Sequence, residues 1–152
     1  MNRLARSLLV ALVAITTLFT SMTAANAFAY ETDLANELAP FSTDDHGCGQ
    51  SIYNTYYWAC FKPDGDKFFI DDWEKDGRSV GIYWQFWQYG AVQRSGICLH
   101  RNGAFHESRC DKNFPENGYV RFHVGRCDGS TENCWYLDSY TNWSGWVSTN
   151  TG

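Results

Sequence analysis

A serine flanked by two glycines is the first pattern in this 152-residue sequence that suggests chemistry. Gly77, Ser79 and Gly81 match G-x-S-x-G, the elbow that presents a nucleophilic serine in α/β-hydrolases. That elbow needs a strand before the serine and a helix after it, so that the hydroxyl projects from a sharp turn. Here a polar turn precedes Ser79 and a predicted strand follows it. We therefore interpret the match as two turn glycines around a serine that enters a strand.

The acidic run at 72–77 (DWEKDG) has the spacing of the first half of a calcium-binding EF-hand loop. Such a loop needs a bidentate glutamate at its twelfth position, which Tyr83 occupies here, and helices on both sides. We interpret the run as an acidic surface loop and predict no metal site and no cofactor. A looser calcium site that adds Asp64 and Asp66 is the alternative.

Two histidines, His100 and His106, lie between Cys98 and Cys110. A histidine side chain is a common general base. Catalysis would also require a nucleophile and an orienting carboxylate brought close by the fold, and the sequence does not show them. We interpret both histidines as exposed residues on a disulfide loop, and we predict no catalytic residue.

The most aromatic segment, Ser79–Tyr89 (SVGIYWQFWQY), alternates as a β-strand does. One face is expected to be core: Val80, Ile82, Trp84 and Phe86. The other face is predicted to bind a ligand: Tyr83, Gln85, Trp87 and Tyr89. Contiguous exposed aromatic residues mark binding surfaces. Sugar rings suit this row, because their C–H faces stack on aromatic rings while amides bond their hydroxyls. The alternative is that both faces are covered and the second row is also core.

The six cysteines predict a disulfide framework: Cys48, Cys60, Cys98, Cys110, Cys127 and Cys134. Six cysteines allow 15 pairings, so the sequence does not fix one. We expect local pairs, 48–60, 98–110 and 127–134, because these intervals suit hairpins or short loops. Zinc ligands usually include cysteines two to four residues apart, and no such pair is present.

The elements that must position these residues are short and β-like. Besides Ser79–Tyr89, the composition and turn signals predict further strands: Ser51–Phe61, Lys67–Asp72, Val92–His100, Tyr119–Gly125, Cys134–Tyr140 and Trp143–Ser148. In Tyr119–Gly125, Val120, Phe122 and Val124 share one face, and Arg121 and His123 share the other. Turn residues recur every 8 to 15 positions and no long helical period appears. The sequence therefore predicts an all-β fold, a single antiparallel sandwich or small barrel stapled by disulfides.

The N-terminal segment reads as an export signal over residues 1–27. It has a basic start with Arg3 and Arg6, an apolar stretch at Ser7–Thr20, and a small-residue cleavage site at Ala25–Ala27. Residues 28–47 are expected to form an N-terminal arm, with either a short helix at 31–38 or a loose leader. Residues 48–152 form a single β domain.

The formal net charge of the chain limits the classes of partner that it can bind. Cleavage would remove two arginines and no acid, which changes the formal net charge from −5 to −7. This balance argues against nucleic acid, whose phosphates must be neutralised by Lys and Arg, and against anionic membranes. We expect no membrane association after cleavage, and the sequence does not fix an oligomeric state.

A series of turn and core motifs runs from residue 64 to residue 125. It consists of a strand, an Asp-Gly turn, a second strand, a cysteine-bounded hairpin and a final amphipathic strand. The segments that carry it are Gly65–Trp84, Gly96–Cys98, Cys110, Asn113-Phe114 and Tyr119–Val124. In these motifs the chain resembles small secreted, cysteine-containing β proteins of unassigned function from actinobacteria. The resemblance implies a secreted β domain and transfers no active site.

These observations favour a secreted, non-enzymatic binding or interaction domain whose ligand is an extracellular glycan or another protein. Two alternatives stay open. One is a small secreted hydrolase that uses histidines and carboxylates. The other is an inhibitor or antagonistic factor that inserts a rigid disulfide loop, such as 98–110, into a partner.

Overall fold

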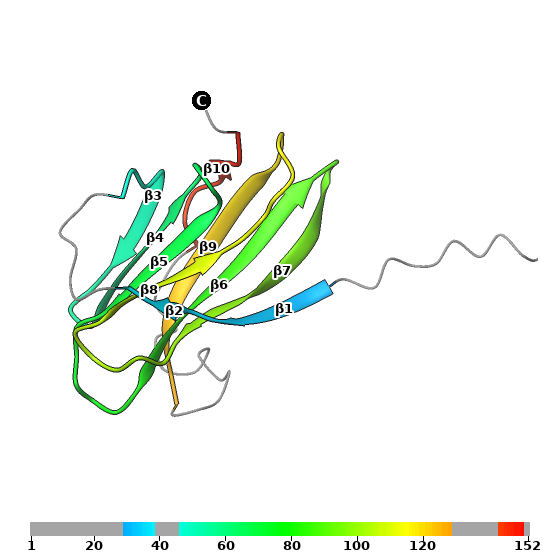
Figure 1. Cartoon of the computed structure of the whole chain (residues 1–152). Helices are drawn as coiled ribbons and strands as arrows, with labels where there is room; N and C mark the ends of the chain where they lie inside the picture. Colours follow the sequence, from blue (N-terminus) through cyan, green and yellow to red (C-terminus); the bar gives the residue numbers. More distant parts are fainter. Residues whose placement is uncertain (1–28, 39–45, 129–142, 151–152) are drawn as a thin grey trace, which may run out of the picture.

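The computed structural model of the chain describes residues 29–38, 46–128 and 143–150. These residues form ten strands and, within those ranges, no helix. The strands build two five-stranded sheets, sheet A and sheet B, packed face to face (Figure 1). This arrangement confirms the predicted all-β, disulfide-stapled fold. The described ranges contain no helix with the length and apolar character needed to span a bilayer. The predicted export signal and the strand expected at 134–140 lie outside the described residues.

Sheet A is built around β6 (Ser79–Gln88), the aromatic strand. Its strand order is β1-β7-β6-β9-β10. The other four strands are β1 (Ala29–Leu34), β7 (Ala91–His100), β9 (Tyr119–Cys127) and β10 (Val147–Ser148). Neighbouring strands are antiparallel except β1, which runs parallel to β7. A β-bulge interrupts the pairing of β6 with β7 between Phe86 and Trp87.

Sheet B has the order β2-β8-β5-β4-β3, and all its pairs are antiparallel. Its strands are β2 (Asn36–Glu37), β8 (Glu107–Asp111), β5 (Lys67–Asp72), β4 (Tyr57–Lys62) and β3 (Gln50–Tyr53). The single strand expected at 51–61 is a hairpin instead. The Asn54 side chain explains the break, because its Oδ1 accepts hydrogen bonds from the backbone N–H of Tyr56 (2.7 Å) and Tyr57 (3.1 Å).

Aromatic side chains dominate the core between the sheets. β6 contributes the four residues predicted to be buried, each at most 1% exposed: Val80, Ile82, Trp84 and Phe86. The inward face of β9 is also as predicted, with Val120, Phe122 and Val124 fully buried. Across the sandwich, the ring of Phe68 on β5 lies 6.3 Å from Trp84 and 5.8 Å from Phe122. Both sheets therefore share one core, and the alternation on β6 and β9 is confirmed for these inward faces.

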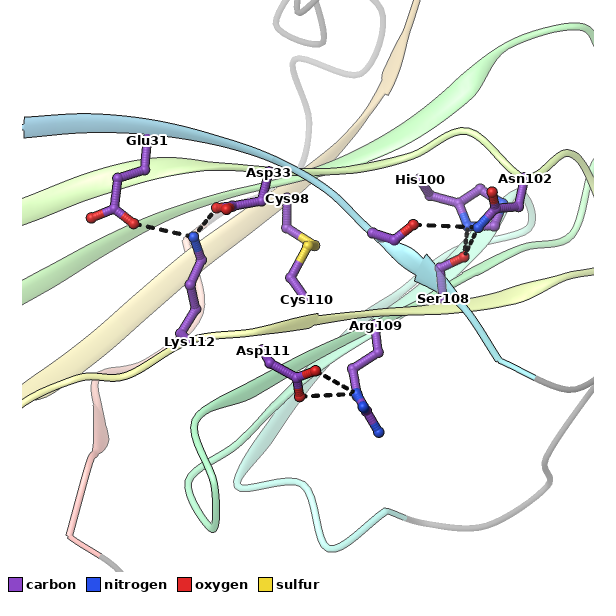
Figure 2. The surroundings of a disulfide bond; sticks show 11 residues. Glu31, Asp33, Cys98, His100, Asn102, Ser108, Arg109, Cys110, Asp111 and Lys112 are labelled. Carbon is purple, nitrogen blue, oxygen red and sulfur yellow. Dashed lines mark hydrogen bonds and ion pairs between the residues drawn. A yellow bond between two sulfur atoms is a disulfide. The ribbon is translucent and has the colours of Figure 1, made fainter.

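Two of the three expected disulfides are confirmed. Cys48 pairs with Cys60, and Cys98 pairs with Cys110, each with a Cα–Cα distance of 6.0 Å. The 98–110 bond does not close a hairpin, because β7 and β8 belong to different sheets (Figure 2). It lies in the interior and staples the two sheets together. The expected 127–134 pair includes Cys134, which lies outside the described residues.

The N-terminal segment forms strands where the sequence allowed a short helix. β1 joins sheet A, the chain crosses at Ala35, and β2 joins sheet B (Figure 1). Glu31 and Asp33 alternate with residues of the opposite face and point inward, where the ammonium group of Lys112 contacts both (Figure 2). The Arg94 guanidinium also bonds Glu31, with an Nε–Oε1 distance of 2.7 Å. Pairing with the free edge of β7 and these ion pairs outweigh local helix propensity.

Candidate functional site

The outward face of sheet A carries the predicted aromatic row. Antiparallel pairing of β6 with β9 places three pairs side by side on this face: Tyr83 with His123, Gln85 with Arg121, and Trp87 with Tyr119. All three predicted β6 side chains are half-buried, whereas the alternate residues of the strand form the core. The two faces of β6 therefore differ in solvent exposure, as in a sheet that has one face packed on the core and one face toward solvent.

A C-terminal segment extends this row beyond β9. The backbone N–H of Ser144 donates to the Phe122 carbonyl (2.7 Å), and the Ser144 hydroxyl accepts from the Phe122 N–H (2.9 Å). These bonds place Trp143 beside His123, with ring centroids 4.5 Å apart. They also place Trp146 beside Trp87, with centroids 6.4 Å apart. We call the resulting surface the aromatic face: Tyr83, Gln85, Trp87, Tyr119, Arg121, His123, Trp143 and Trp146.

Arg121 joins the strands of this face to the C-terminal segment. Its Cζ lies 4.3 Å from the centroid of the Trp143 ring and 4.7 Å from that of Trp146, within cation–π range. Its Nε and Nη2 both donate to the Gln85 Oε1, at 2.9 and 2.7 Å. The Gln85 Nε2 in turn lies 3.4 Å from the Tyr83 hydroxyl. We call Trp143, Arg121 and Trp146 the Trp–Arg–Trp cluster.

A cavity of about 390 Å³ opens at one end of the aromatic face. Among the described residues, Trp87, Tyr119 and Trp146 line it. Tyr119 and Trp146 remain 44% exposed, so their rings are accessible from solvent. The volume lies within the range of small-ligand sites, which are mostly apolar with a few polar groups at fixed positions. We call this cavity the aromatic slot.

The electrostatics of the face depend on Arg121. Burial, and to a smaller extent the charge of Arg121, lower the pKa of His123 to about 4. His123 is therefore neutral near pH 7. Across the described residues of this face, the formal charge is that of one arginine.

Three of the four residues predicted to bind a ligand lie on the aromatic face, and Tyr89 does not. β6 ends at Gln88, and the Tyr89–Gly90 pair forms the turn into β7 with positive φ at both residues (53° and 80°). The alternation therefore stops one residue early, and the Tyr89 ring is 87% exposed beyond the strand. A two-residue turn with left-handed backbone explains the change.

Sequence reasoning did not assign Tyr119, Arg121, Trp143 or Trp146 to a site. A signal was present for Arg121, because the alternation of 119–125 puts it on the outward face together with His123. No local pattern shows that the segment with Trp143 and Trp146 lies beside β9. That placement depends on pairing with residues 22 to 29 positions earlier in the chain.

His100 is buried, so its predicted exposure is wrong. Its Nδ1 lies 2.8 Å from the Ser108 Oγ and its Nε2 lies 2.9 Å from the Gly103 carbonyl oxygen (Figure 2). Burial lowers the pKa of His100. A neutral ring that donates from Nε2 and accepts from the Ser108 hydroxyl satisfies both nitrogens. This histidine–serine pair has no exposed surface and is a structural network of the interior.

The remaining sequence candidates have structural partners. Ser79 begins β6, and none of the described residues after it is helical. In the acidic loop, Asp72 accepts from the N–H of Glu74 (3.1 Å), and Asp76 accepts from Arg126 (3.0 Å). Within the described ranges no group of three or more His, Cys, Asp or Glu side chains has an arrangement that could hold a metal ion.

The outward face of sheet B carries a different feature, a buried pair of acids. Asp71 on β5 and Glu107 on β8 are opposite each other in register. His46 lies against this face, with its ring stacked 4.1 Å from Phe69 and its Nε2 2.7 Å from the Glu107 Oε1. The disulfide at Cys48 ties the segment that contains His46 to β4. Burial, with a further contribution from Glu107, raises the pKa of Asp71 to about 7.

No family model, curated protein or solved structure matches this chain. The resemblance to actinobacterial secreted proteins stays a prediction. The functional argument therefore depends on the geometry of the aromatic face.

Proposed function

We propose that the protein is an extracellular, non-enzymatic binding domain whose aromatic face holds a glycan. The observation that carries this proposal is the aromatic slot, in which Trp87, Tyr119 and Trp146 line a cavity of about 390 Å³. Aromatic residues that stay exposed on an otherwise well-packed domain mark interaction sites. The slot continues along β6 into a row that also offers amide, hydroxyl and guanidinium groups.

Sugar rings match this combination of groups. A pyranose ring has apolar C–H faces, which stack on indole and phenol rings, and a rim of hydroxyls that need hydrogen-bond partners. Gln85, Arg121 and the hydroxyl of Tyr83 lie between the aromatic side chains and supply such partners. Binding sites of this kind combine mostly apolar walls with a few polar groups at fixed positions.

The chemistry of the face favours binding over hydrolysis. Glycoside hydrolysis usually needs two carboxyl groups placed on either side of the scissile bond. The described residues of the aromatic face include no Asp or Glu, and its histidine has a lowered pKa. The buried histidine–serine network at His100 has no surface that a substrate reaches.

An extracellular location fits the covalent chemistry of the fold. The two disulfides are compatible with an extracellular protein, because such bonds persist in oxidising compartments. The export signal predicted at residues 1–27 supports the same location.

Binding of the secreted protein to a panel of insoluble and soluble polysaccharides tests the proposal. Trp87→Ala removes one wall of the slot and is expected to weaken glycan binding roughly tenfold or more. Tyr53→Ala is the matched control, since Tyr53 is 71% exposed on β3 of sheet B, and its removal should leave binding unchanged. Circular dichroism and melting curves establish that both variants are folded.

The proposal is wrong if the wild-type protein retains no polysaccharide of the panel. It is equally wrong if a polysaccharide is retained by Trp87→Ala and wild type with the same affinity.

A further inference from the structure

Arg121 differs in its partners from three other cations of the sandwich, Arg94, Arg126 and Lys112. Arg94 and Arg126 each form an ion pair with a carboxylate, and Lys112 contacts two. Arg121 is held by the two indoles of the Trp–Arg–Trp cluster and by the neutral amide of Gln85. No carboxylate of the described residues lies within ion-pair distance of it. Within the described part of the chain, its positive charge is therefore held in place by neutral groups, without a carboxylate partner.

The unused donors of Arg121 form one edge of its guanidinium. Five N–H groups are available in an arginine side chain. Two of them, on Nε and Nη2, bond the Gln85 Oε1. The three that remain are on Nη1 and the outer side of Nη2, and they have no hydrogen-bond partner among the described residues. Two parallel N–H groups of this kind are the arrangement that binds a carboxylate or a sulfate through two oxygens.

The position of Arg121 connects this edge to the aromatic slot. Arg121 lies over the Trp146 ring, and the same ring is one wall of the slot. On β9, Arg121 is also two residues from Tyr119, so both side chains point to the same face at a spacing of about 7 Å. A sugar ring in the slot would therefore place its substituents within reach of the guanidinium.

We propose that Arg121 selects glycans that carry an oxyanion, so that the ligand of the aromatic face is an acidic polysaccharide. This inference rests on the proposed glycan-binding function. The shared chemistry is an oxyanion on a sugar ring, from either a uronic acid carboxylate or a sulfate ester. Non-specific attraction of polyanions does not produce the same preference, because the chain is acidic overall, with a formal net charge of −5.

The sharpest test changes the ligand rather than the protein. Affinities of the full secreted protein are measured for a polyuronate, for the same polymer with its carboxyls methyl-esterified, and for a sulfated polysaccharide beside its unsulfated parent. We expect about tenfold tighter binding, or about 1.4 kcal/mol, to one charged polymer of a pair than to its neutral counterpart. The pair that shows the preference identifies the oxyanion as carboxylate or sulfate.

Protein variants then locate the preference. Arg121→Gln should bind the charged and the neutral polymer of that pair equally, because the positive charge is lost. Arg121→Lys keeps the charge and the contact with the indoles, so it should retain part of the preference and controls for disruption of the Trp–Arg–Trp cluster. Arg109→Gln is the matched control on the outward face of sheet B, where Arg109 pairs with Asp111, and it should behave as wild type.

Equal affinity of the wild type for charged and neutral polymers would overturn the inference, as would a preference that persists in Arg121→Gln. Both results leave glycan binding itself intact if Trp87→Ala still weakens binding to a neutral polymer. Failure of the proposed function looks different, since Trp87→Ala would then change the affinity for no polymer of the set.

Discussion

The outward faces of the two sheets differ in which side chains they bury and which they leave exposed to solvent. On sheet B, the acids Asp71 and Glu107 are both buried, and His46 lies against Glu107. On sheet A, the rings of Tyr119 and Trp146 remain nearly half exposed around an open slot. The outward face of sheet B therefore buries polar groups, whereas the outward face of sheet A leaves aromatic rings exposed to solvent.

This contrast shows which face is available for a partner. On a covered face, apolar side chains are stabilised because they are removed from water. Any acid on that face is desolvated as well, which disfavours its charged form. An uncovered aromatic face gives up burial of its rings. The rings of Tyr119 and Trp146 are accessible from solvent, and so the exposed rings of sheet A, rather than the buried acids of sheet B, carry the functional proposal.

The largest expected effect tests whether the aromatic face is distinct from the core. Trp84→Ala should lower the free energy of unfolding by about 3–5 kcal/mol, because Trp84 is fully buried. Trp87→Ala, three residues away on the opposite face, should cost less than about 2 kcal/mol because its ring is already partly in water. Chemical denaturation of the two variants measures both values. Equal losses would mean that the aromatic face is core and would remove the contrast.

A smaller loss of stability is expected when the segment that contains His46 is released from sheet B. Replacing Cys48 and Cys60 together by alanine should lower stability by about 3 kcal/mol in the chain-entropy account of a short loop. Hydrogen exchange at the amides of Asp71 and Glu107 should become faster as the His46 segment loosens. Affinity for the glycan should not change, since the aromatic face belongs to the other sheet. A loss of glycan binding in this variant would show that the two faces are coupled.

The smallest effect is the pH dependence that Asp71 on sheet B contributes to stability. Asp71 has a folded-state pKa raised from 3.8 to about 7, so it favours folding fully below pH 4 and loses that contribution as the pH rises to 7. Asp71→Asn mimics the protonated group and should be more stable than wild type at pH 8, with little difference at pH 4. Melting curves across this range test the sign. A wild type whose stability rises from pH 4 to pH 8 relative to the variant would contradict it.

The sequence predicted the structure best in strands where apolar and polar side chains alternate strongly. On β6 and β9 the two-residue period assigned each core residue correctly and put Tyr83, Gln85 and Trp87 on the outward face. The disulfides 48–60 and 98–110 also followed from their spacing, although the spacing did not reveal that the second one joins two sheets. In these segments local pattern and tertiary burial agree.

The failures share a physical cause, because each depends on a strand pairing or on sheet packing that the local pattern does not show. β1 replaces a plausible helix since it meets the free edge of β7, and His100 is buried because β8 places Ser108 against it. Trp143 and Trp146 join the aromatic face through bonds to β9 that no local pattern encodes. Tyr89 is the exception, since its departure from the row reflects a turn of two residues.

The parallel pairing of β1 with β7 has a consequence for assembly and for self-association. β1 is synthesised before every other described strand, yet each of its backbone partners, from Arg94 to Leu99, lies 65 positions further along the chain, so it completes its pairing only after β7 has formed. Until then, the bare edge of β7 is a template on which another chain could add a strand. Once docked, β1 becomes the edge of sheet A, and it directs Glu31 and Asp33 inward. A foreign strand that continued the sheet would have to pack beside these charges, which protects the assembled sandwich against edge-to-edge aggregation.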